Sequence, residues 1–241
     1  SAPGRQPSCY LLERGVSIDS GALASALSLD EQQEIRDVFL THAHWDHVRD
    51  LPLHMINRRA ETPTLQVHGL ARTVEDIRTH LMNERVWFAA FDLPSRQAPY
   101  VAAQPMAPGD VRECQGYRIT AVEMPHTVPA IGYHVDDGRV SAMLCADTSG
   151  GGFARRIPTT GSPLRAILLE TSFPNEMRQF AEMTGHLTPE MLADEVADLG
   201  PDVQVFATHM KPGFEERLTA ELAALGRPNL RACRDGDVIE L

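Results

Sequence analysis

Three histidines and one aspartate follow one another within residues 42–47. Imidazole and carboxylate groups are the ligands that divalent metals such as zinc prefer. The apolar residues that end at Leu40 predict a buried strand, so the cluster lies where a strand gives way to a loop. We expect two metal positions, one beside the first two histidines and one beside the aspartate and the last histidine. A polar loop without special function is the alternative, and the order of four ligand-type residues disfavours it.

The composition is that of a globular protein with a sizeable core. The chain has 241 residues, of which 43% are hydrophobic, and we expect one domain over residues 1–241 or two intimately packed halves. No apolar run approaches the roughly 20 residues that cross a bilayer, so no membrane partner is expected. The net charge of −11 disfavours a broad contact with nucleic acid, whose phosphates require Lys and Arg. A small anionic substrate remains compatible, because bound metal cations dominate the local field.

The four cysteines, at positions 9, 114, 145 and 233, show no Cys-x-x-Cys spacing. This pattern predicts reduced structural thiols in a reducing compartment, and we expect a cytoplasmic protein. Residues 1–5 lack the charged-then-apolar layout of a signal peptide. A signal that has already been removed would make the periplasm the alternative.

Short apolar segments alternate with helical patterns along the chain, which predicts two sheets packed face to face and covered by helices. In the first half, strands are predicted at 9–18, 35–40 and 65–68, and helices at 23–27, from 28 onward, at 47–57 and at 73–83. In the second half, strands are predicted at 117–123, 130–135, 140–146, 164–170 and 203–208, and helices at 188–199 and 214–225, before a closing segment at 238–241.

Further candidate metal ligands stand at the ends of predicted strands in the second half. His126 follows one strand, Asp147 ends another before a glycine-rich loop, and His209 ends a third. Each of them alone would be an ordinary surface or hydrogen-bonded residue. Because all three share this position, we expect them to converge with the first cluster on one metal site.

Together these residues resemble the metallo-β-lactamase fold superfamily, whose His-x-His-x-Asp-His signature is intact at residues 42–47. The resemblance implies an α/β fold, the αββα sandwich, with two packed mixed sheets flanked by helices. It also implies two divalent metals, zinc first, with Mn and Fe as alternatives. The implied ligands are His42, His44 and His126 for one metal, Asp46, His47 and His209 for the other, and Asp147 as the bridge. Asp19 looks like the strand-end aspartate of the family, which orients a ligand.

Two later stretches, 169–175 and 184–189, look like the phosphodiesterase branch of the superfamily, most of all like class II 3′,5′-cyclic-nucleotide phosphodiesterases. This resemblance implies that His186 faces the substrate phosphate and that Glu170 orients it. The implied reaction opens cAMP or cGMP to the 5′-monophosphate, by attack of metal-activated hydroxide on phosphorus and proton donation to the leaving O3′. We take His186, Glu170 and Asp46 as the catalytic residues. A histidine hydrogen-bonded within its own helical turn is the alternative for His186.

The substrate contacts are weaker predictions. Asn83 and Trp87 lie in a segment that resembles the helix-to-loop segment of the same phosphodiesterases, and an indole can stack on a nucleobase. A core position for Trp87 is the alternative. Arg155 follows a run of three glycines and could contact phosphate, although a solvated loop fits equally. Related enzymes are often homodimers, and segment 79–91 is then a candidate contact.

Three other functions are alternatives to a cyclic-nucleotide phosphodiesterase. A tRNA 3′-end processing nuclease shares the metal motifs, but no basic or Gly/Pro-rich arm for tRNA is evident and the negative charge disfavours it. A hydrolase of another ester, such as a lactone, sulfate ester or thioester, would use the same metals. A non-catalytic metal-binding module is disfavoured because all seven ligands are present.

Overall fold

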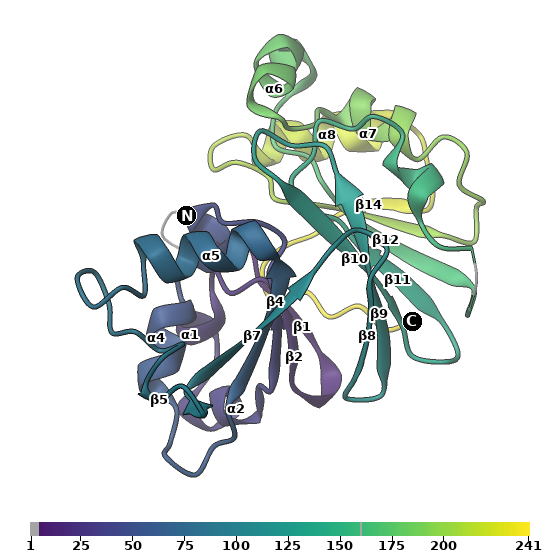
Figure 1. Cartoon of the computed structure of the whole chain (residues 1–241). Helices are drawn as coiled ribbons and strands as arrows, with labels where there is room; N and C mark the ends of the chain where they lie inside the picture. The colour runs from purple at the N-terminus through teal and green to yellow at the C-terminus, as the bar shows by residue number, and fades with distance from the viewer. Residues whose placement is uncertain (1–4, 160) are drawn as a thin grey trace. The chain divides into compact units, whose positions relative to one another are not determined.

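The computed structural model describes residues 5–159 and 161–241. The chain divides into two compact units, one that ends at Ala107 and one from Pro108 to Leu241, and each contains one large mixed sheet with helices (Figure 1). Residues 1–4, on which the expectation about a signal peptide rests in part, lie outside the described residues. Among the described residues, no helix has the length and apolar character that crossing a membrane requires.

The first unit has a five-stranded sheet in the order β1-β2-β3-β4-β7, antiparallel between β1 and β2 and parallel elsewhere. Its strands are β1 (Tyr10–Leu12), β2 (Val16–Ile18), β3 (Asp37–Phe39), β4 (Leu65–Leu70) and β7 (Val101–Met106), with a separate short pair, β5 (Pro94–Ser95) and β6 (Ala98–Pro99). Its helices are α1 (Leu23–Ala26), α2 (Leu29–Glu34), α3 (Trp45–Val48), α4 (Leu51–Asn57) and α5 (Ala71–His80). Helix α5 packs on β4 and β7.

The single strand predicted at 9–18 is wrong, because the chain reverses within it. A 3-10 turn at Glu13–Gly15 separates β1 from β2, and Arg14 and Gly15 have φ values of 65° and 81°. A Cβ at Gly15 would lie 2.2 Å from the backbone oxygen of Glu34, so glycine is required for space as well as for conformation. The sequence does not separate the two strands because the residues on both sides of the turn are mostly apolar and are typical of strands.

The second unit has a seven-stranded sheet in the order β14-β13-β12-β11-β10-β9-β8. The pairs from β14 to β11 are parallel and those from β11 to β8 antiparallel. Its strands are β8 (Val111–Cys114), β9 (Tyr117–Met124), β10 (Ala130–Asp136), β11 (Ser141–Leu144), β12 (Leu164–Glu170), β13 (Gln204–Thr208) and β14 (Leu230–Ala232). Its helices are α6 (Arg178–Thr184), α7 (Pro189–Glu195) and α8 (Glu215–Ala224).

Local sequence signals explain where several of these elements begin and turn. Ser28 caps α2 in a reciprocal capping box with Glu31, where the sequence predicts that a helix begins. Thr188 accepts a hydrogen bond from the backbone N–H of Met191 at the start of α7, which ends at Glu195 and is shorter than predicted. The hairpin turn at 136–138 joins β10 to β11, between the strands predicted at 130–135 and 140–146.

Each unit has its own core of buried apolar side chains, and the strand ends carry polar residues out of that core. Because β9 and β11 both pair antiparallel with β10, their carboxyl ends lie at the same end of the sheet. The hairpin turn at 136–138 lies at the opposite end of these strands. This arrangement places the residues that follow β9, β11, β12 and β13 close together.

Candidate active site

The ligand cluster of the first unit follows β3 directly. The fully buried ring of His42 lies 4.6 Å from the ring of His44 and 4.1 Å from that of His47, measured between centroids. His44 is the N-terminal cap residue of α3, and Asp46 stands in the first turn of this helix. The structure thus brings together, within one unit, the four residues that the signature at 42–47 predicts as ligands.

Asp19 organises this cluster from the end of β2. Its Oδ1 accepts hydrogen bonds from the backbone N–H and the hydroxyl of Thr41, at 2.8 and 3.0 Å. Its Oδ2 lies 2.6 Å from Nδ1 of His47, and both residues are buried. The Thr41 hydroxyl in turn lies 3.0 Å from Nδ1 of His42. Because both rings turn Nδ1 toward these partners, Nε2 is the nitrogen suited to a metal.

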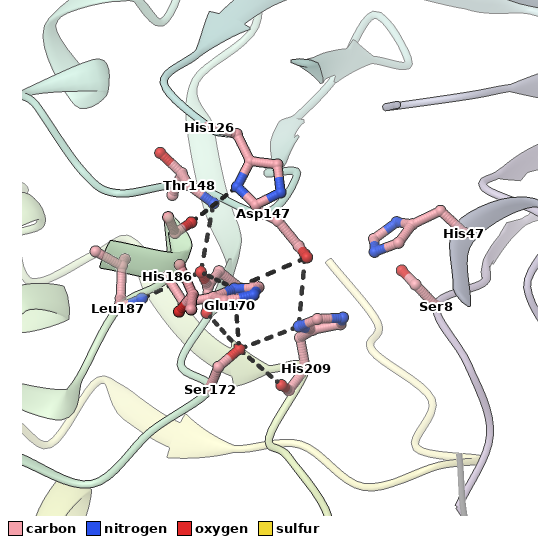
Figure 2. A network of polar contacts seen from close by, with 12 residues as sticks. Ser8, His47, His126, Asp147, Thr148, Glu170, Ser172, His186, Leu187 and His209 are labelled. Carbon is pink, nitrogen blue, oxygen red and sulfur yellow. Dashed lines mark hydrogen bonds and ion pairs between the residues drawn. The ribbon is translucent and has the colours of Figure 1, made fainter. Parts of the chain in front are cut away.

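In the second unit, His126, Asp147 and His209 follow β9, β11 and β13 (Figure 2). His126 Nδ1 lies 2.9 Å from the backbone oxygen of Gly185, which can only accept, so Nδ1 carries the proton. Oδ1 of the buried Asp147 lies 3.4 Å from His209 Nδ1. Asp147, His186 and His209 each offer one ligand atom, and these atoms lie within 4.8 Å of one another.

Glu170 is the centre of the polar network in this unit (Figure 2). Its Oε1 accepts hydrogen bonds from the backbone N–H groups of Leu187 at 3.1 Å and Thr148 at 3.3 Å, and it lies 2.9 Å from His186 Nδ1. Its Oε2 accepts from the Ser172 hydroxyl at 2.9 Å. Four donors offset the free-energy cost of burying this carboxylate at the end of β12.

His186 is held on several sides and is 8% exposed. Its ring contacts that of Phe173 edge-on at 5.6 Å and stacks with that of His209 at 5.7 Å. The His186 side chain contacts Glu170. The alternative for His186 would have required a hydrogen bond within its own helical turn instead. Because Nδ1 faces Glu170, Nε2 is the nitrogen through which this ring can exchange a proton.

Gly185, between α6 and His186, combines two constraints. It has a φ of 74° and caps the carboxyl end of α6. A Cβ at this position would lie 2.7 Å from His126 Nδ1 and 3.2 Å from the backbone nitrogen of Thr127. Glycine therefore lets the backbone pass close enough to orient the His126 ring.

The three weak substrate candidates make local contacts. The Asn83 side chain accepts from the backbone N–H groups of Arg85 and Val86, and so closes its own turn. Trp87 is half-buried, and its ring lies 6.2 Å from that of Phe88. Arg155 is exposed and lies 3.8 Å from Asp198. Their contacts with a substrate stay predictions.

Sequence reasoning missed the two hydroxyl groups that tie these networks together. Thr41 links Asp19 to His42, and Ser172 links Glu170 to His209. The available signal was their position, since Thr41 directly precedes the ligand cluster and Ser172 stands two residues after Glu170.

Residues 17–210 match the family described as the beta-lactamase superfamily domain, and the chain belongs to this family. It is similar in structure to a metallo-beta-lactamase fold protein of Bacillus subtilis, with a TM-score of 0.75 and 16% identity over 98% of this chain and 92% of that one. The expected fold class is therefore confirmed, with mixed sheets and helices of the metallo-β-lactamase fold.

Two curated relatives are similar in sequence. A probable 3′,5′-cyclic-nucleotide phosphodiesterase of Yersinia pestis is 25% identical over 211 residues, which are 77% of this chain and 60% of the relative. A ribonuclease Z of Pyrococcus abyssi (strain GE5 / Orsay) is 30% identical over 103 residues, which are 42% of this chain and 30% of the relative. The chain thus spans less than two thirds of the length of either relative. These relatives support a hydrolase family that includes phosphodiesterases.

Proposed function

We propose that this chain is a dinuclear-metal phosphodiesterase that hydrolyses 3′,5′-cyclic nucleotides such as cAMP and cGMP to 5′-monophosphates. The observation that carries the proposal is the contact between His186 and Glu170, beside Asp147 and His209. The similarity to the Yersinia phosphodiesterase supports the same reaction class.

The donor set fits divalent metals such as zinc, because it consists of imidazole and carboxylate groups. The Nδ1 atoms of His47 and His126 face Asp19 and the Gly185 carbonyl, an arrangement typical of metal-ligating histidines. In this proposal His42, His44 and His126 would hold one metal, Asp46, His47 and His209 would hold the other, and Asp147 would contribute to both. Two bound metals would lower the pKa of a water molecule and neutralise charge on the phosphodiester.

We assign the proton transfer to His186. With its Nδ1–H donated to Glu170, this ring can deliver a proton from Nε2 to the leaving O3′ of the ribose. The Glu170 carboxylate accepts from Nδ1 and so fixes the orientation of the ring. Asp46 acts from the first turn of α3, as a ligand that sets the position of the reacting centre.

A ribonuclease Z-like activity on tRNA 3′ ends is the second candidate, because the relative from Pyrococcus is 30% identical over its matched part. The net charge of −11 disfavours it, since a tRNA contact relies on cationic side chains along the phosphate backbone. Hydrolysis of a lactone, a sulfate ester or a thioester by the same residues is the third candidate.

The test is to incubate metal-replete protein with cAMP, cGMP, bis(p-nitrophenyl) phosphate and a precursor tRNA, and to identify the products by chromatography. We expect 5′-AMP or 5′-GMP. Turnover of the chromogenic diester without cleavage of either cyclic nucleotide would contradict the assignment of substrate. Cleavage of the precursor tRNA alone would favour the second candidate, and light scattering on the same sample tests the predicted homodimer.

A further inference from the structure

We propose that Ser172 is a positioning residue that fixes the tautomer of His209 and couples this histidine to the Glu170–His186 pair. The inference rests on the proposed function, because it concerns His209 as a metal ligand. Ser172 lies in the stretch 169–175 that resembles the phosphodiesterase branch, but the resemblance assigns it no role, and its role is inferred from its contacts.

Ser172 is fully buried, and its hydroxyl lies between two histidines (Figure 2). Oγ is 2.9 Å from Glu170 Oε2, 3.1 Å from His209 Nδ1 and 3.3 Å from His186 Nδ1. A hydroxyl has one hydrogen to donate, and a carboxylate can only accept, so the hydrogen of Ser172 points to Glu170. The contact with His209 must then be donated by the ring, from Nδ1–H to Oγ.

The oxygens of Asp147 and of the His209 backbone also lie near these donors, and both are less well placed than the partners above. Asp147 Oδ1 is 3.4 Å from His209 Nδ1, beyond the usual range for an N–H···O hydrogen bond. The backbone oxygen of His209 is 3.2 Å from the Ser172 hydroxyl, farther than Glu170 Oε2. The shortest set of contacts is therefore the chain from His209 through Ser172 to Glu170.

The backbone holds Ser172 and His209 against each other. The N–H of Thr171 donates to the oxygen of Thr208 at 2.9 Å, and the N–H of Lys211 donates to the oxygen of Ser172 at 3.3 Å. His209 itself has a φ of 57°, which is uncommon outside glycine and asparagine. The ends of β12 and β13 thus orient the His209 ring and the Ser172 hydroxyl toward each other.

One carboxylate then sets the tautomers of two histidines, His186 directly and His209 through a hydroxyl. In both rings Nδ1 carries a proton, and in His209 this leaves the lone pair on Nε2. Removal of the hydroxyl should affect His209 more than His186, because His186 keeps its 2.9 Å contact with Glu170, which is shorter than its 3.3 Å contact with Ser172.

The test uses Ser172→Ala, Ser172→Thr, which keeps the hydroxyl, and Ser141→Ala as a matched control. Ser141 is buried at the opposite end of β11 from Asp147. Long-range ¹H–¹⁵N NMR of the metal-free proteins reports the tautomer of each histidine, with the His209 signals assigned from a His209→Gln variant. Zinc titration by calorimetry reports metal affinity and stoichiometry.

We expect protonated Nδ1 on His209 in the wild type and a shift toward protonated Nε2 in Ser172→Ala. The affinity for one of the two zinc ions should fall about 10- to 100-fold, and Ser172→Thr should restore it. An unchanged tautomer and unchanged affinity in Ser172→Ala would overturn this inference and leave the proposed function intact. An equal loss in Ser141→Ala would also overturn it, and a wild-type protein that binds no zinc would overturn both.

Discussion

Asp19 Oδ2 lies 2.6 Å from Nδ1 of His47, and this contact joins two buried residues that are 28 positions apart. The same carboxylate accepts from the backbone and side chain of Thr41. Asp19 has a φ of 60°, in the left-handed region. A residue at the end of one strand therefore fixes the loop that follows the next strand, and orients a histidine of the candidate metal site.

Replacement of Asp19 by asparagine tests this relationship. Asn adopts a positive φ as readily as Asp, so Asp19→Asn removes the charge without adding backbone strain. We expect metal affinity to fall about 10- to 100-fold, because His47 loses the partner that orients it. Calorimetric zinc titration measures the change. The control is Asp50→Asn, since Asp50 is a buried acid of the same unit that accepts from Ala24 and Ser25, and equal affinity loss in both variants would contradict a specific role for Asp19.

Removal of the proposed proton donor should separate catalysis from metal binding. We expect His186→Ala to lower kcat about 10²- to 10⁴-fold while both metals stay bound. Glu170→Gln should also lower kcat, because an amide oxygen accepts a weaker hydrogen bond from His186 Nδ1–H than a carboxylate does and orients the ring less firmly. Steady-state kinetics with cAMP and metal analysis of the same samples provide the readout. His80→Ala, at an exposed position of α5, is the control, and full activity of His186→Ala would rule out the donor role.

Gly185→Ala should destabilise the protein by more than its backbone conformation alone explains. A left-handed φ costs a non-glycine residue about 1–2 kcal/mol. Gly226 has a φ of 63° and open space where a Cβ would lie, so Gly226→Ala isolates this cost. Gly185→Ala adds a Cβ 2.7 Å from His126 Nδ1, so its loss of unfolding free energy should be the larger of the two. Urea unfolding measures both, and equal losses would show that the close approach to His126 is relaxed without cost.

Burial lowers the pKa of His54 from 6.5 to about 3, and the charge of Arg58 acts in the same direction. His54 thus stays neutral in the folded chain where the unfolded chain takes up a proton. Its contribution to the unfolding free energy is complete above pH 6.5 and is lost as the pH falls toward 3, with about 2 kcal/mol lost by pH 5.

The comparison of wild type with His54→Gln at pH 8 and pH 5 tests this dependence. Because the other titrating groups are common to both proteins, the stability gap between them should shrink by about 2 kcal/mol at the lower pH. Urea unfolding gives the gap, and His80→Gln is the exposed control for the substitution. A gap that is the same at both pH values would show that the His54 pKa is not depressed.

The sequence predicts most strands of the second unit because each carries a long apolar run that a buried strand requires. It does not predict β8 and β14 of this unit, which are short and contain charged residues, or β7 of the first unit, which contains Gln104 and Pro105. Helix α6 is missed for a similar reason. Its exposed residues Phe180 and Met183 break the amphipathic pattern.

The residues of the candidate site also fall into those that the sequence predicts and those that it does not. The ligand-type residues are visible in the sequence because His and Asp at strand ends are chemically distinctive. Thr41, Ser172 and Gly185 are not, because hydroxyl groups and glycines are common, and their roles depend on distances of about 3 Å between segments far apart in the chain. Motifs in the sequence therefore indicate which residues can bind a metal, and the structure shows which neighbours orient those residues.

The hairpin turn between β10 and β11 has a practical consequence. Asp137 Oδ1 accepts from the backbone N–H groups of Arg139 and Val140, and a Cβ at Gly138 would meet nothing within 4 Å. The turn is thus well formed, open on its outer side and separated from His126 and Asp147 by the length of the strands. A fluorophore or a surface tether attached at this turn would report on the chain, or immobilise it, without touching the end of the sheet that carries the ligands.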